Sequence, residues 1–200
     1  MAGGLDIASF AVFAASQVGT PGPANMVLLT AGARYGLRAA LPFVAGVVVS
    51  KQLVIWPLGF GLLALGAQSP VIFEVLRWGS AAYILYLAWR IAGSRIVPGE
   101  VGSAPGFFSG LVVHPLNPKA WAMITVGFTQ FASPGAPDWE VAASIAGVLL
   151  VLQLVLHPIW CWGGERIAAA IADTPAERWL MRGLALLTVA SVAWVLAKGG

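Results

Sequence analysis

Six apolar stretches divide this chain, and each is long enough to cross a lipid bilayer as a helix. A spanning helix needs about 20 apolar residues to cross about 30 Å of hydrocarbon. Because a lone strand cannot satisfy its backbone in lipid, all six stretches are predicted to be transmembrane helices of an all-α integral membrane protein. The stretches lie near residues 5–33, 39–66, 70–92, 106–131, 140–162 and 178–198.

The composition agrees with a membrane protein and excludes several other classes. Hydrophobic residues make up 59% of the chain and charged residues only 10%, whereas soluble domains have about 25% charged residues. The net charge of +3 comes from basic residues scattered singly, which argues against a nucleic-acid partner. A single cysteine, Cys161, cannot form an internal disulfide, and the absence of a Cys/His cluster argues against a metal site.

The basic residues between the stretches predict the orientation. They fall in the first, third and fifth links and are absent from the second and fourth. Cytoplasmic loops carry the excess of Lys and Arg, so both termini are predicted to lie outside the cytoplasm, with the multi-pass body in lipid. The basic residues of these links are Arg34, Arg38, Arg90, Arg95, Arg166, Arg178 and Arg182.

The first stretch contains an interruption, "SQVGTPGPANMVLL", in which Pro21 and Pro23 flank Gly22. Proline removes a backbone donor and collides with the preceding turn, so this run predicts a broken helix. Freed backbone groups are tolerated at this depth only beside protein or a water-filled cavity. The interruption therefore predicts a cavity.

The fourth stretch contains a second interruption, "VVHPLNPKAWAMI", where Pro115 and Pro118 bracket Asn117. Pro23 and Pro118 are 95 residues apart, close to half the chain. Two units of three helices must enter the membrane in opposite senses, so the pairing predicts an inverted repeat with broken first and fourth helices. The predicted repeats are residues 1–98 and 106–200, joined by a cytoplasmic linker at 99–105.

The residue types at the two interruptions suit an anion. Asn117 is a good N-cap, Pro118 suits the first helical position, and Lys119 adds a cation to the positive end of the helix dipole. The first interruption offers a similar helix start and a nearby amide, Asn25, so a carboxylate between the two starts would meet donors from both repeats. The predicted substrate-binding residues are Thr20, Pro21, Gly22, Pro23, Asn25, Lys51, Asn117, Pro118 and Lys119.

Three further polar residues lie inside predicted spans. Lys51 is near the middle of the second stretch, unless its long stem lets the ammonium group reach the interface. His114 and His157 each precede a proline and are candidates for a proton relay together with Lys51, because imidazole titrates near neutrality. Donation by each ring to a carbonyl freed by the following proline is an equally consistent interpretation.

Four sequence segments resemble the LysE/RhtB family of bacterial amino-acid exporters. They are "TPGPAN" from Thr20, "ARYGLRAAL" from Ala33, "GVVVSK" from Gly46 and "NPK" from Asn117. The resemblance extends over nearly the whole chain in size and span order. It implies a small carrier of the bacterial inner membrane that exports amino acids or related metabolites, is driven by the proton gradient and uses no cofactor.

One position departs from that family. Its second helix commonly reads Gly-Asp where this chain has Ser50-Lys51, which replaces an acid near the membrane centre with a base. Lys51 could hold a substrate carboxylate, take the place of a coupling ion or carry the coupled proton. The missing acid favours neutral or acidic amino acids, or another small carboxylate, over lysine and arginine.

The predicted function is therefore a secondary-active efflux carrier, an antiporter working by alternating access, and a homo-oligomer is an additional expectation for its assembly. A passive channel or helper subunit would share the fold without coupling. A membrane enzyme is disfavoured because the spans lack a nucleophile with a base and hold no acid beyond the shallow Glu74.

Overall fold

The computed structural model describes residues 4–62 and 104–171, together with single positions between 78 and 193. Regular structure in these ranges is helical, as predicted. The third predicted span (70–92), the sixth (178–198) and most of the linker (99–105) lie outside the described residues. The count of six spans and the inverted repeat therefore stay predictions.

The first predicted span is broken where the prolines stand. Helix α1 (Ile7–Gly19) ends before Thr20, which is extended. Helix α2 (Pro23–Ser50) then begins with Pro23 in its first turn and Gly22 as its N-cap. The interruption therefore separates two helices.

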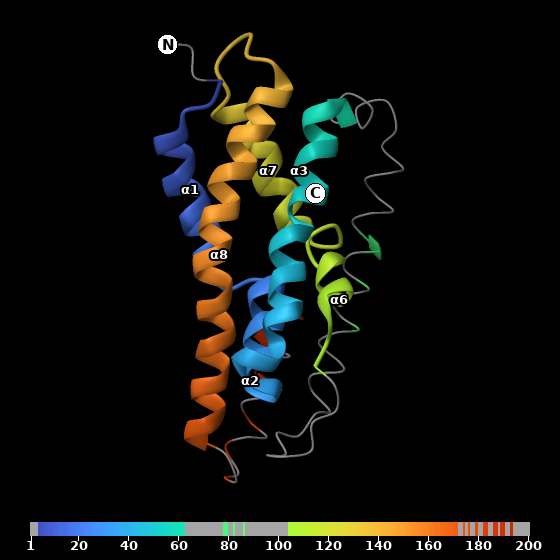
Figure 1. Cartoon of the computed structure of the whole chain (residues 1–200), viewed down its shortest axis with the longest axis vertical. Helices are drawn as coiled ribbons and strands as arrows, with labels where there is room; N and C mark the ends of the chain where they lie inside the picture. Colours follow the sequence, from blue (N-terminus) through green and yellow to red (C-terminus); the bar gives the residue numbers. More distant parts are fainter. Residues whose placement is uncertain are drawn as a thin grey trace.

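Helix α2 contains a sharp turn at Gly36, inside the predicted first link. Gly36 has φ 74° and ψ 159°, a left-handed φ that glycine adopts without strain. The backbone N–H of Leu37 donates to Oε2 of Glu165 (2.9 Å), so a carboxylate holds the start of the next helical segment. Figure 1 shows the chain reversing here and rising toward α3 (Gln52–Pro57), which the π-helical turn η1 (Leu58–Leu62) follows.

The fourth predicted span is broken as well. A short helix, α6 (Phe107–Leu111), leads into an irregular segment, and α7 (Pro118–Gln130) starts at the second proline of the motif. The fifth span is helix α8 (Asp138–Ile171), which extends beyond the predicted 140–162 and runs through Pro158. Its additional turns keep packing on α2 through Gly164 and Ala168, so the helix does not end with the apolar run.

Helices α1 and α7 lie side by side in opposite directions. At one end Leu5 pairs with Ala132, and the N–H of Asp6 donates to the carbonyl of Phe131 (2.9 Å). At the other end, Nζ of Lys119 donates to Oγ1 of Thr20 (3.0 Å). The two breaks therefore meet inside the molecule, at the end of α1 and the start of α7.

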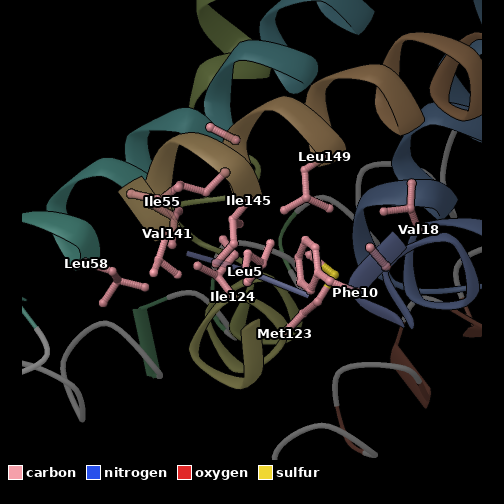
Figure 2. Packing of buried hydrophobic residues seen from close by; sticks show 14 residues of the cluster. Leu5, Phe10, Val18, Ile55, Leu58, Met123, Ile124, Val141, Ile145 and Leu149 are labelled. Carbon is pink, nitrogen blue, oxygen red and sulfur yellow. The ribbon is translucent and has the colours of Figure 1, made fainter. Parts of the chain in front are cut away.

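A hydrophobic cluster joins α1, α3, α7 and α8 on one side of these breaks. Figure 2 shows Phe10 of α1, Ile55 of α3, Ile124 of α7 and Ile145 of α8 gathered in it, and all four are fully buried. Burying such a side chain contributes about 1.5–3 kcal/mol when the alternative is water. The cluster fixes the half-helices on either side of the cavity.

The closest approach between helices is backbone to backbone. A Cβ atom added at Gly32 of α2 would collide with the carbonyl of Cys161, and one added at Gly164 of α8 with the carbonyl of Leu29. Cys161 itself is buried in this contact. Small residues allow such contacts in membrane helices, where dispersion rather than water exclusion drives packing.

Two further glycines allow close packing. A Cβ at Gly110 of α6 would collide with the carbonyl of Phe43, and one at Gly59 with the side chain of Ala142 on α8. Together with the α2–α8 contact, these glycines set how closely the helices approach around the breaks.

The outer face of α8 is apolar. Exposed large residues along it include Val151, Val155 and Ile159, a surface that suits lipid. Pro23–Gly61 and Asp138–Ile171 are each long and apolar enough to cross a membrane, whereas Ile7–Gly19 is apolar but shorter. These lengths agree with a membrane protein whose first span is divided at the break.

The two adjacent glycines of α8 provide a test of the packing. Gly164→Ala should lower the melting temperature of the detergent-purified protein by several degrees, since overpacking a tight contact costs about 1–3 kcal/mol. Gly163→Ala is the matched control, because nothing lies within 4 Å of its added Cβ. Equal melting temperatures for the two variants would contradict the backbone contact.

Candidate functional site

A small cavity of about 30 Å³ lies where the two breaks meet. Its lining comes from α1, α2, the α2–α3 junction, the second break, α7 and α8. A volume of this size holds about two water molecules. The lining residues are Gln17, Val18, Gly22, Ala24, Asn25, Lys51, His114, Asn117, Lys119, Ala120, Met123 and His157.

The side chain of Lys119 crosses from the second break to the first. Its Nζ donates to Thr20, whose hydroxyl also donates to the carbonyl of Gln17 (3.2 Å). A Cβ built on Gly22 would stand 3.3 Å from Nζ, so a larger residue would press on the lysine. Gly22 has extended backbone that any residue adopts, and its small size is therefore the reason for glycine here.

Asn25 satisfies the carbonyl groups that the first break leaves open. Its Nδ2 donates to the carbonyl of Val18 (2.7 Å) and to that of Thr20 (2.8 Å). Both amide hydrogens are used in this way, so Asn25 secures the break and presents only its oxygen to other groups.

The second break is secured by different means. Oδ1 of Asn117 accepts from the N–H of Lys119 (3.1 Å), which is the N-cap predicted from the sequence. The indole of Trp121 donates to the carbonyl of Pro115 (2.9 Å). The sequence did not indicate the latter contact, since Trp121 reads there only as one more aromatic residue.

The two helix starts differ in what they offer a ligand. The first N–H groups of α7 are engaged by Asn117 through its side chain and its carbonyl. The N-cap of α2 is Gly22, which has no side chain to accept from the first turn, and the first residues of that turn line the cavity. The start of α2 is therefore the helix end whose positive dipole faces the cavity.

Lys51 is buried at the junction of α2 and α3, with only 3% of its surface exposed. It lines the cavity and does not reach an exposed surface, which answers the alternative that it snorkels to the interface. It lies within electrostatic range of Lys119. The described part of the cavity lining contains these two lysines and no Asp or Glu.

Several buried polar side chains form a cluster near Lys51. The rings of His114 and His157 stack with centroids 5.7 Å apart, and Nε2 of His114 lies 3.0 Å from Nε2 of Gln153. Ser50 accepts from the backbone N–H of His114 (3.3 Å). The His114 ring thus bonds to a side chain rather than to a freed carbonyl. Among the described residues, Nδ1 of both histidines and Oε1 of Gln153 have no hydrogen-bond partner.

The structure brings most of the predicted residues to one place. Seven of them line the cavity, Thr20 bonds to one of these, and Pro23 and Pro118 form the helix starts, whereas Pro21 is exposed. Ser50 and Gln153, which contact His114, were not among the predicted site residues. Their signal was a polar side chain inside an apolar helix, which does not distinguish helix packing from a site. The seven lining residues are Gly22, Asn25, Lys51, His114, Asn117, Lys119 and His157.

Exchanging amide for carboxylate separates the two asparagines. Asn25→Asp removes both donors to the carbonyls of Val18 and Thr20, and an unsatisfied buried group costs about 1–3 kcal/mol. Asn117→Asp keeps the oxygen that caps α7, and Asp is as good an N-cap as Asn. The melting temperature in detergent should fall for Asn25→Asp and hold for Asn117→Asp. The reverse order would refute these hydrogen-bond assignments.

Comparisons with known proteins place the chain in a family. The family described as LysE type translocator matches residues 15–199. The cysteine/O-acetylserine efflux protein of Klebsiella pneumoniae is 30% identical, covering 96% of this chain and 91% of the relative. That of Salmonella paratyphi A is 31% identical over 68% of this chain and 69% of the relative.

A relative named for other exported solutes also matches. The homoserine/homoserine lactone efflux protein of Salmonella typhimurium is 27% identical over 76% of this chain and 77% of its own length. No solved structure matches the chain. Since the family match covers nearly the whole chain, and a relative at 30% identity spans it as well, this protein belongs to the LysE type translocator family of transporters.

Proposed function

We propose that this protein is a secondary-active carrier that exports small amino acids across the bacterial inner membrane by alternating access. The observation that carries the proposal is the meeting of two broken helices around one cavity whose described lining holds two lysines and no acid. Broken helices at the centre of a bundle are a common basis of substrate sites in transporters.

The carboxylate of the solute would bind between the breaks. Lys119 supplies an ammonium group where the two breaks meet. The uncapped start of α2 supplies N–H donors with a favourable dipole. Lys51 adds a second cation on the other side of the cavity. Charge-assisted hydrogen bonds of this kind are about twice as strong as neutral ones.

The size of the cavity supports a mechanism with more than one state. Room for about two water molecules is too small for an amino acid, so binding requires the helices around the breaks to move apart. The Lys119–Thr20 hydrogen bond spans the two breaks, and a carboxylate that takes over Lys119 would release it. Binding and opening are coupled in this way.

The lining favours amino acids with small neutral side chains. A basic side chain would bring a second positive charge of the solute into a cavity whose described lining holds Lys51 and Lys119 but no acid. The names of the relatives give cysteine, O-acetylserine, homoserine and homoserine lactone as exported solutes, and the first three are amino acids of the favoured kind. We take this class as the substrate class of the chain.

Coupling to protons completes the proposal. Lys51, His114 and His157 are titratable groups of the cavity lining, and we assign the coupled proton to them. With both termini outside the cytoplasm, as the basic links predict, an incoming proton would be exchanged for an outgoing amino acid.

Proteoliposomes test the proposal directly. Vesicles loaded with unlabelled L-homoserine or L-cysteine should take up the same labelled amino acid by saturable counterflow, and an imposed proton gradient should drive accumulation. Flux that neither saturates nor shows counterflow would mean a passive channel. Absence of flux for every amino acid tried would refute the carrier.

Lys119 provides the matching mutational test. Lys119→Met keeps the length of the stem and removes the charge that meets the carboxylate, so KM should rise at least tenfold, about 1.4 kcal/mol or more. Arg38→Gln, which removes an exposed cation near the Gly36 turn, serves as the control and should leave KM unchanged. Equal KM values for wild-type and Lys119→Met would show that the carboxylate binds elsewhere.

A further inference from the structure

The proposed substrate is a zwitterion, so the cavity must bind an ammonium group as well as a carboxylate. Once Lys51 and Lys119 hold its carboxylate, its ammonium group still requires hydrogen-bond acceptors, because burying a charge without partners is unfavourable. The described part of the lining has no Asp or Glu, so neutral acceptors are the groups available there to receive it.

Asn25 supplies an acceptor whose orientation the fold determines. The oxygen and nitrogen of an amide are often interchangeable, but the carbonyls of Val18 and Thr20 can accept only from the NH₂ group. Oδ1 is therefore turned away from them. Asn25 is buried and lines the cavity, and the described residues supply no donor to its oxygen.

Two imidazoles supply further acceptors. His114 and His157 line the cavity with 3% and 1% of their surface exposed, and Nδ1 of each has no partner among the described residues. A neutral imidazole always has one unprotonated nitrogen that accepts. Because buried polar atoms are almost always paired, unpaired ones on residues that line a cavity indicate a ligand.

Gln153 contacts one of these two histidines from outside the cavity lining. It is fully buried, contacts Nε2 of His114 at 3.0 Å and is absent from the cavity lining. If the amide is turned so that its oxygen accepts from Nε2–H, the lone pair of Nδ1 is left for a ligand. Gln153 is thus a positioning residue for His114.

We infer that Asn25 Oδ1 and the His114–His157 pair form a subsite for the primary ammonium group of the exported amino acid. The inference rests on the proposed function and assigns the two ends of the solute to different groups. Lys51 lies within electrostatic range of both imidazoles, and the solute carboxylate at the lysines offsets the repulsion its charge would exert on the ammonium.

The same subsite explains exchange with protons. A doubly protonated imidazole has two donors and no acceptor, so it cannot receive an ammonium group. In the part of the chain that the structure describes, the charged groups that line the cavity with the imidazole pair are Lys51 at the α2–α3 junction and Lys119 on α7. Proton and solute therefore exclude each other at one place, as an exchanger requires.

Amino acids paired with analogues that lack the amine provide the test. L-Homoserine and γ-hydroxybutyrate, and L-cysteine and β-mercaptopropionate, compete with labelled amino acid in counterflow by the full-length protein. Wild-type should prefer the amine-bearing member of each pair at least about tenfold, because a site built to hydrogen-bond a group rejects the analogue without it. Equal competition would overturn the subsite, whatever the variants do.

Three variants locate the discrimination. His157→Phe keeps a ring but removes the acceptor and should abolish the preference for the amine, whereas His157→Gln keeps an acceptor and should retain part of it. Gln52→Leu is the control and should retain all of it, since Gln52 donates to the carbonyl of Ala146 outside the cavity lining.

The possible failures are distinguishable. If His157→Phe weakens both members of a pair equally, the histidine has a structural or water-binding role and the subsite is refuted. If transport and counterflow are intact but wild-type shows no preference for the amine, only the subsite fails. If wild-type moves no amino acid at all, the proposed function fails and the subsite with it.

Discussion

A helix broken inside a bilayer exposes carbonyl and N–H groups that lipid cannot satisfy, and the centre of this protein is organised by that constraint. At the first break, Asn25 and Thr20 return hydrogen bonds to the end of α1. At the second, Asn117 and Trp121 do the same around the start of α7. The groups left over line the cavity, so the requirement that makes the breaks stable also selects where a polar solute can bind.

Close packing keeps the breaks together. Gly32 and Gly164 bring the backbones of α2 and α8 into contact, and Gly110 brings α6 against α2. The hydrophobic cluster on the other side joins the half-helices α1 and α7 to α3 and α8. The broken helices are thus held by neighbours on both sides, while the contact between the breaks themselves includes a single lysine–threonine hydrogen bond. Because the contact between the breaks is the weaker one, a transport cycle would separate the helices there.

The sequence predicted the local features of the site well because proline and glycine act on their own neighbours. The ends of α1 and α6 and the starts of α2 and α7 follow from Pro21, Pro23, Pro115 and Pro118. The partners across the fold could not be predicted in this way. Thr20 and Lys119 are 99 residues apart, and spacing alone does not reveal that they touch.

Gln153 is another residue whose partner the sequence could not reveal. A glutamine in an apolar helix fits helix packing as well as a site, and only its approach to His114 distinguishes the two. Lys51 likewise had two interpretations until its burial at the α2–α3 junction placed it at the cavity. The length of α8 was underestimated because helical packing continues after the apolar run ends.

The central claim is that the paired breaks enclose a water-accessible site that the exported solute occupies. Thr20→Cys in a Cys161→Ala background tests it with an anionic thiol reagent that does not cross lipid. The cysteine should react, and the transported amino acid should protect it, whereas Val12→Cys on the 75%-exposed apolar face of α1 should stay unlabelled in the membrane. A Thr20→Cys protein that never reacts, or reacts equally with and without the solute, would contradict the account.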